Sequence, residues 1–313
     1  MAHAADKRIG HGNEHGRSAG AGGCRRRRLD GGRHTCYPPV EVISDSIISS
    51  RRTNATAKMD VMCYSNDARP PLPPIRGGST DDTELVLAAG DDNRLLAYAA
   101  RAAKPTGAGI VVMPDVRGLH PFYKELARRF AEAGVDAVAI DYFGRTAGIG
   151  DRSGDFDFMT HVKQTTPDGV AADVAAGLAH LRSPAGGGAS STFTVGFCFG
   201  GSLSWRQSAA QPGLAGAIGF YGRPANVRNA IPQMRAPLLL LIAGDDRATP
   251  RDEFEKFGQE LTEANVPHEM VVYEGAPHSF FDRGFEQHRA ASDDAWRQML
   301  DFIKDQTRQP ARA

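Results

Sequence analysis

Cysteine is scarce in this sequence, and the few cysteines do not form the pattern of a disulfide framework or of a metal site. Only four occur among the 313 residues: Cys24, Cys36, Cys63 and Cys198. The first three lie in or near an irregular N-terminal stretch. None belongs to a Cys-x-x-Cys pair or to a His/Cys cluster with zinc spacing. This usage is typical of a reduced cytoplasmic protein, and it predicts no metal.

The chain also lacks long apolar runs and an overall excess of charge. No stretch of about 18 apolar residues occurs, and the N-terminus lacks the apolar core of a secretory signal. The formal net charge is zero, but residues 1–58 hold 11 Lys and Arg against 5 Asp and Glu, so the remainder is mildly acidic. An acidic body disfavours nucleic acid and anionic membranes as partners. We therefore expect a cytoplasmic protein with neither partner.

Composition divides the chain into four parts. Residues 1–58 are rich in Gly, Arg, His and Ser, have little periodicity and contain an Arg block at 25–28, which predicts a disordered basic tail. Residues 59–79 include the run Pro-Pro-Leu-Pro-Pro at 70–74 and are expected to form an extended lead-in. Regular patterning follows over residues 80–306, which we predict to be one domain. Residues 307–313 complete the chain as a short C-terminal tail.

The patterned part alternates strand and helix signals. The first predicted helix, 122–133, places Phe122, Leu126 and Phe130 four residues apart on one face and ends at Gly134. Continuous apolar strands between helices are typical of a mostly parallel sheet with helices on both faces, the α/β class. Function in such sheets gathers at the C-terminal ends of the strands. The predicted strands are 84–88, 95–99, 109–113, 135–140, 192–196, 216–220, 238–243 and 269–273, and the further helices are 167–181, 199–209, 251–264 and 291–304.

A nucleophile elbow is indicated at residues 196–201, Gly-Phe-Cys-Phe-Gly-Gly, directly after the predicted strand 192–196. At such an elbow a strand turns sharply into a helix and exposes the reactive atom. Glycines flank it because a Cβ there would collide with neighbouring backbone. The start of a helix favours the thiolate form of Cys198, since the helix dipole stabilises negative charge. The alternative is a buried structural cysteine in a glycine-rich turn.

Downstream loops supply an acid and a base. Two adjacent carboxylates, Asp245 and Asp246, follow the strand 238–243, and His278 follows the strand 269–273. A thiol nucleophile needs a base to take its proton, and the base needs an orienting acid. The order nucleophile, acid, histidine is that of α/β-hydrolases. Taken singly, Asp246 could be a helix cap and His278 a surface residue, but the three together predict a catalytic triad.

The sequence from about residue 80 to 305 resembles the dienelactone hydrolase family (carboxymethylenebutenolidase-like α/β-hydrolases). The resemblance rests on the cysteine elbow, on Gly244-Asp245-Asp246 with Pro250 beyond, on His-Ser-Phe at 278–280, and on Asp-Tyr-Phe-Gly-Arg at 141–145. It implies an α/β-hydrolase fold and cleavage of a small lactone or ester through an acyl-thioester. It also implies that Cys198 is the nucleophile, His278 the base and Asp246 the acid, because the family acid lies two residues after the glycine.

Further residues take their expected roles from this resemblance. Family members hold an acidic residue, usually Glu, near the thiol, and Asp115 stands at this position with one methylene fewer. The backbone N–H groups of Val116 and Phe199 would form the oxyanion hole. Arg145 matches an arginine that binds the substrate carboxylate, and Arg283 is a possible second one although its spacing differs.

Several alternatives stay open at this level. A cysteine amidotransferase also uses a Gly-x-Cys-x-Gly elbow, but it has Glu two residues after the histidine, where this chain has Phe280. An esterase or thioesterase for another small acyl group is compatible with the same fold, as is a non-enzymatic binding module. No phosphate loop or dinucleotide fingerprint is present, so we expect no cofactor. The sequence does not fix the oligomeric state, for which we favour a monomer.

Overall fold

The computed structural model describes residues 34–35, 68–75, 77–154 and 156–307. Its centre is a nine-stranded sheet in the order β1-β9-β8-β7-β6-β4-β5-β3-β2. The pairs β2–β3 and β3–β5 are antiparallel and all other pairs are parallel. The strands are β1 (His34–Thr35), β2 (Ser79–Ala88), β3 (Arg94–Ala102), β4 (Ala108–Met113), β5 (Asp136–Ile140), β6 (Ser191–Phe197), β7 (Gly216–Phe220), β8 (Leu238–Asp245) and β9 (His268–Pro277).

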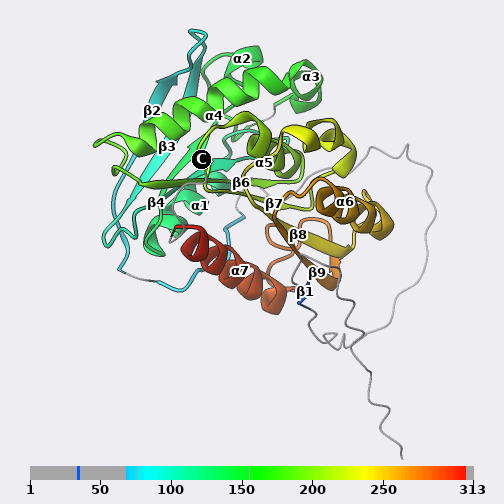
Figure 1. Ribbon diagram of the computed structural model, residues 1–313. Helices are drawn as coiled ribbons and strands as arrows, with labels where there is room; N and C mark the ends of the chain where they lie inside the picture. The colour runs from blue at the N-terminus through cyan, green and yellow to red at the C-terminus, as the bar shows by residue number, and fades with distance from the viewer. Residues whose placement is uncertain (1–33, 36–67, 76, 155, 308–313) are drawn as a thin grey trace, which may run out of the picture.

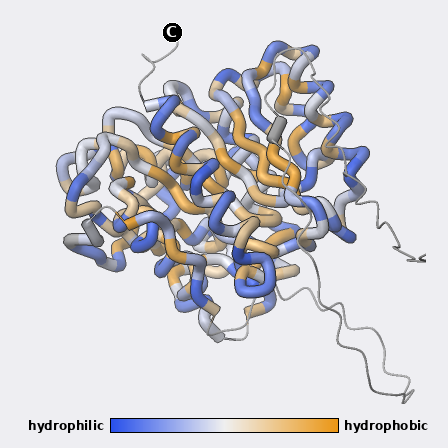
Figure 2. Tube along the Cα trace, turned by 90° about the horizontal axis from the view of Figure 1, so that it is seen from below, coloured by the Kyte–Doolittle hydropathy of each residue, from blue (hydrophilic) through white to orange (hydrophobic). Residues whose placement is uncertain are grey.

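Helices cover both faces of this sheet, as predicted (Figure 1). On one face lie α1 and α7, and on the other lie α4, α5 and α6. Figure 2 shows hydrophobic residues concentrated in the interior and hydrophilic residues toward the outside. The helices are α1 (Pro121–Glu132), α2 (Gly144–Ala147), α3 (Phe158–Gln164), α4 (Pro167–Arg182), α5 (Phe199–Ala210), α6 (Arg251–Glu263) and α7 (Arg289–Thr307), with 3₁₀ turns at Pro224–Asn226 and Arg228–Gln233.

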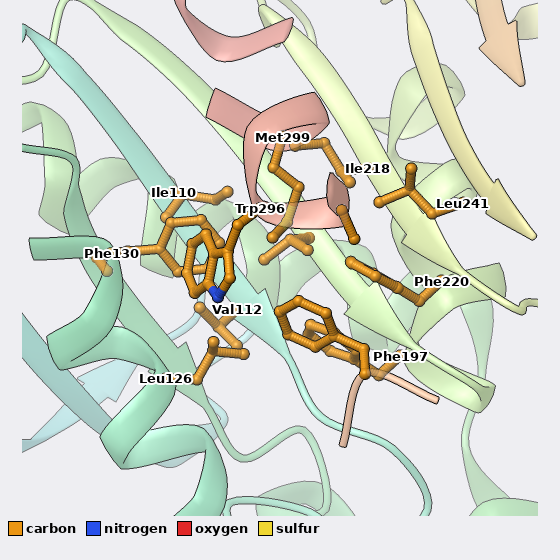
Figure 3. Packing of buried hydrophobic residues seen from close by; sticks show 14 of the residues in the cluster. Ile110, Val112, Leu126, Phe130, Phe197, Ile218, Phe220, Leu241, Trp296 and Met299 are labelled. Atoms are coloured by element: carbon orange, nitrogen blue, oxygen red, sulfur yellow. The ribbon is translucent and has the colours of Figure 1, made fainter. Parts of the chain in front are cut away.

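Each face of the sheet has its own hydrophobic core. Beneath α1 and α7, Trp296 packs against Phe130 with ring centroids 4.8 Å apart, and Met299 lies beside it (Figure 3). On the other face Trp205 of α5 packs against Phe257 of α6, with ring centroids 5.6 Å apart. Both tryptophans are fully buried. Because β4 and most of β8 are buried on both sides, their sequences are nearly continuously apolar rather than alternating.

Local signals explain where the helices begin and end. His120 caps α1 by accepting the backbone N–H of Phe122, and α4 begins with Pro167 behind a Thr166 cap. Gly134, with φ +92°, follows the end of α1. The predicted stripe of α1 is fully buried, and so is the stripe of α4 formed by Val170, Val174, Leu178 and Leu181. The predicted strands and helices are all present, with shifts of a few residues at their ends.

The structure adds elements that the sequence did not predict. Helices α2 and α3 have four and seven residues, too few to show a helical stripe. Of the expected basic tail the structure describes only His34–Thr35, which pairs with Met270–Val271 at the sheet edge. The remainder of residues 1–58 lies outside the described residues, so its disorder stays a prediction. The lead-in contacts the domain, because the indole Nε1–H of Trp296 donates to the carbonyl oxygen of Pro71 at 3.0 Å.

Candidate active site

Cys198 lies between β6 and α5, where the backbone is strained. Its φ is +54° and its ψ is −112°, a conformation that residues with a side chain rarely adopt. Its backbone N–H donates to the carbonyl oxygen of Phe220, at the end of the adjacent strand β7, at 3.1 Å. Strain of this kind is typical of a nucleophile elbow and persists only where the surroundings enforce it.

The glycines around Cys198 let backbone segments approach each other closely. A Cβ at Gly196 would collide with the carbonyl oxygen of Gly200. One at Gly200 would collide with the carbonyl oxygen of Pro114, in the loop after β4, and one at Gly201 with that of Phe220. The expected collision of any Cβ at Gly196 and Gly200 with neighbouring backbone is confirmed. The elbow therefore fits against the loop that carries Asp115.

Cys198, His278 and Asp246 form one hydrogen-bonded chain. The imidazole of His278 contacts Cys198 by a hydrogen bond. Its Nδ1–H donates to Oδ2 of Asp246 at 2.7 Å, and the backbone N–H of Ala248 donates to the other carboxylate oxygen, also at 2.7 Å. The Asp246 side chain is fully buried, whereas the neighbouring Asp245 is exposed. The structure thus brings the three predicted residues together, with Asp246 as the partner of His278.

The surroundings of His278 favour its protonated form. Burial by itself lowers the pKa of His278, but the hydrogen bonds with Asp246 and Cys198 outweigh burial and raise the pKa to about 10. A protonated imidazole stabilises a thiolate beside it. Near neutral pH the geometry therefore favours a thiolate at Cys198 paired with an imidazolium at His278.

Asp115 is fully buried in the loop that follows β4. Its Oδ1 accepts the backbone N–H of Arg117 at 2.9 Å, which closes a local turn. Two tyrosines hold its backbone: the N–H of Asp115 donates to Oη of Tyr123 at 3.0 Å, and Oη of Tyr142 donates to the Asp115 carbonyl oxygen at 2.8 Å. Asp115 therefore has a structural role in this turn. Its expected role in ionising the thiol stays a prediction.

The two backbone groups expected to form the oxyanion hole lie on adjacent loops. Val116 follows β4 and Phe199 begins α5 after β6, and β4 pairs directly with β6 through Met113 and Gly196. As the first residue of α5, Phe199 has an N–H without a partner inside the helix. This placement is compatible with the expected pair of donors.

Two residues that the sequence did not single out lie beside His278. The ring of Tyr221, at the end of β7, is 4.7 Å from the imidazole between centroids. The Tyr221 hydroxyl donates to Oδ2 of Asp282 at 3.0 Å, and the Asp282 side chain is buried. Because Asp282 is only four residues after His278, the sequence could have indicated that the two residues lie close together. Tyr221 is 57 positions from His278 and comes near it only through the order of the strands.

Arg145, expected to bind a substrate carboxylate, is held by carboxylates of the protein itself. Its Nε and one terminal nitrogen donate to Asp173, both at 2.9 Å, and its two terminal nitrogens donate to Asp91 at 2.6 and 2.9 Å. All three guanidinium nitrogens are thus engaged, so this geometry does not support the expected role. Arg283 is exposed, and its backbone N–H donates to Asp282. A role for Arg283 in substrate binding stays a prediction.

One surface hollow lies away from the triad. It has a volume of about 630 Å³ and is lined by Thr106, Val135 and the last turns of α7. Thr106 and Val135 precede β4 and β5, so this hollow lies at the N-terminal ends of the strands, opposite Cys198. Within residues 68–75, 77–154 and 156–307, no group of three His, Cys, Asp or Glu residues has a metal-binding arrangement. None of the described helices is both long and apolar enough to cross a membrane.

Comparison with known proteins places this chain in a family. The model of the dienelactone hydrolase family matches residues 95–307, about two thirds of the chain and all of the triad region. The chain belongs to the dienelactone hydrolase family. It is therefore a carboxylic ester hydrolase with the α/β-hydrolase fold, as the sequence predicted.

Individual relatives agree with this assignment. A carboxymethylenebutenolidase of Rhodococcus opacus is 29% identical over 261 residues, which cover 78% of this chain and 96% of the relative. A Salmonella typhi protein, provisionally named as a carboxymethylenebutenolidase, is 30% identical over 231 residues, which cover 68% of this chain and 83% of the relative. A solved structure from Klebsiella pneumoniae, provisionally named as a dienelactone hydrolase, has 29% identity and a TM-score of 0.58, covering 72% of this chain and 99% of that one.

Proposed function

We propose that this member of the dienelactone hydrolase family cleaves a small lactone or carboxylic ester through a covalent acyl-thioester on Cys198. The observation that carries the proposal is the hydrogen-bonded chain from Cys198 through His278 to the buried Asp246, set at a strained elbow. A nucleophile, a base and an orienting acid are the groups that acyl transfer requires.

In the first half of the proposed reaction the Cys198 thiolate attacks the carbonyl carbon of the substrate. A C–S bond forms, and the negative charge that develops on the carbonyl oxygen is stabilised by the N–H groups of Val116 and Phe199. As the tetrahedral intermediate collapses, the C–O bond to the leaving group breaks and His278 gives its proton to that oxygen. A lactone opens at this step and keeps its new hydroxyl attached.

In the second half His278 takes a proton from water, and the resulting hydroxide attacks the thioester carbonyl. The C–S bond breaks, the carboxylic acid leaves and Cys198 regains its negative charge. Asp246 keeps the Nδ1–H of His278 directed toward itself, so that the other ring nitrogen faces the reacting groups. The atoms balance as the addition of one water molecule to the ester bond.

A panel of lactones, p-nitrophenyl esters and acyl thioesters tests this function. We expect turnover of lactones or esters by the wild type, loss of turnover in Cys198→Ala with an unchanged melting temperature, and an acyl adduct on Cys198 in quenched samples by mass spectrometry. Preferred cleavage of thioesters would indicate the thioesterase alternative, and absence of all turnover the binding module. Appreciable turnover by Cys198→Ala would exclude the covalent mechanism.

A further inference from the structure

A second buried carboxyl group lies next to the proposed triad. Asp282 is 1% exposed, and its Oδ2 accepts a hydrogen bond from the Tyr221 hydroxyl at 3.0 Å. Its Oδ1 accepts the backbone N–H of Arg283. We propose that Asp282 is a positioning residue that acts through Tyr221: it holds the tyrosine ring against the imidazole of His278 and so sets the orientation of the base. This inference rests on the proposed function and deepens it.

Tyr221 is fixed at both ends. Its φ of +36° is rare for a residue with a bulky side chain, and its backbone N–H donates to the carbonyl oxygen of Leu241 at 2.9 Å. A residue in such a conformation costs on the order of 1–3 kcal/mol and is retained where the surroundings enforce it. At the other end of the side chain, the hydroxyl is held by Asp282. The ring between these two anchors is fully buried and inclined 52° to the imidazole of His278.

The imidazole needs this support because Asp246 binds only one of its two ring nitrogens, Nδ1. His278 must direct Nδ1–H to Asp246 and its other nitrogen to Cys198 at the same time. A hydrogen bond weakens steeply away from linearity, so rotation of the ring about its contact with Asp246 would lose the alignment with sulfur. The Tyr221 ring, packed 4.7 Å from the imidazole, limits this rotation. A misplacement of about 1 Å at a reacting group costs on the order of 100-fold in rate.

The charges around Asp282 are compatible with this role. The pKa of Asp282 is raised to about 8, mainly by burial and also by the nearby Asp115, against the lowering effects of the Arg283 N–H, the Tyr221 hydroxyl and His278. Near neutral pH Asp282 is therefore mostly protonated. It then holds Tyr221 without competing with Asp246 for the positive charge of His278.

The experiment compares two tyrosines that each donate to a buried aspartate. Tyr221→Phe removes the hydroxyl that binds Asp282. The matched control is Tyr273→Phe, because the Tyr273 hydroxyl donates to Oδ2 of Asp294 at 3.1 Å, also in the buried interior. Asp282→Ala removes the carboxyl group, and Asp282→Asn keeps a polar partner for both Tyr221 and the Arg283 N–H. The readouts are the pH profile of Cys198 alkylation by iodoacetamide, and kcat and KM for the best ester or lactone of the wild type.

We expect Tyr221→Phe and Asp282→Ala to shift the midpoint of the alkylation profile and to lower kcat about tenfold or more with little change in KM. Tyr273→Phe should change neither, and Asp282→Asn should restore the profile near neutral pH. Equal effects of the two tyrosine substitutions would overturn the proposal, as would unchanged profiles in both Tyr221→Phe and Asp282→Ala. If Asp282→Ala does not fold, the comparison of Tyr221→Phe with Tyr273→Phe in the same two readouts tests the proposal. Alkylation of Cys198 requires no turnover, so the alkylation profile tests the role of Asp282 even if the protein does not hydrolyse esters. The proposed function itself is tested by the turnover of Cys198→Ala.

Discussion

Asp115 is expected from the sequence resemblance to help ionise the thiol, and its buried carboxylate already closes a turn with the Arg117 N–H. Asp115→Asn keeps an oxygen that accepts this N–H but removes the charge. If the charge helps to ionise the thiol, we expect slower acylation and several-fold slower alkylation of Cys198 by iodoacetamide near neutral pH. Asp245→Asn, which changes an exposed neighbour of the triad, serves as the control. Unchanged rates in Asp115→Asn would leave Asp115 with its structural role alone.

Asp282 makes a separate prediction for stability. Its pKa is about 8 in the folded protein, where burial is the main cause, and 3.8 is its ordinary value. Between these values the folded state binds a proton that the unfolded state has released, so this residue makes the protein less stable as the pH rises from about 4 to 8. Asp282→Asn removes this effect. We therefore subtract the free energy of unfolding of wild type from that of the variant at each pH. This difference should be larger at pH 8 than at pH 5 by at least about 1 kcal/mol, since one pKa unit corresponds to roughly 1.4 kcal/mol.

Urea unfolding at a series of pH values measures this difference. The same substitution at Asp245, an exposed residue beside Asp246, is measured as the control. A constant difference for Asp282→Asn would mean that Asp282 is ionised in the folded protein.

The elbow between β6 and α5 depends on contact between backbone atoms. A Cβ at Gly200 would collide with the carbonyl oxygens of Pro114 and Met113, whereas a Cβ at Gly90 would meet no atom within 4 Å. Overpacking costs about 1–3 kcal/mol even where side chains can yield, and backbone yields less. We expect Gly200→Ala to lower the melting temperature by several degrees and to abolish turnover. Gly90→Ala should leave both unchanged. A fully active, stable Gly200→Ala would show that α5 can move away from β4.

The elements that could be predicted from sequence are those with a long periodic or continuous apolar pattern. The buried stripe of α1 and the apolar run of β4 both lie where expected. Helix α2 was missed because four residues cannot show a period. Tyr221 was missed because its proximity to His278 depends on the tertiary arrangement of β7 and β9. The role expected for Arg145 came from a motif, which could not indicate that Asp91 and Asp173 would surround its guanidinium.

At the scale of the molecule, the patterned domain should function without the first 58 residues. The described part of this segment, His34–Thr35, adds two residues to the edge of the sheet, far fewer than a typical strand. The lead-in, in contrast, is anchored by the hydrogen bond from Trp296 to Pro71. We expect a chain that begins at Met59 to retain kcat/KM and melting temperature within error.

Limited proteolysis of the full chain provides the second measurement for this prediction. Residues 1–58 should be cleaved well before the domain. Protection of this segment, or a clear loss of stability on its removal, would mean that it packs on the domain. A chain that begins at residue 77 should be less stable, because it also loses the carbonyl group of Pro71.

The two hydrophobic cores each contain one buried tryptophan, and these are the only two tryptophans of the chain. Intrinsic fluorescence can therefore report on the two sides of the sheet separately. Trp205→Phe leaves an emitter between α7 and α1, and Trp296→Phe leaves one between α5 and α6 (Figure 3 shows the former site). Coincident emission changes in the two variants during denaturation would show that both layers unfold as one cooperative unit. Separate transitions would show that one layer loosens first, and would identify which.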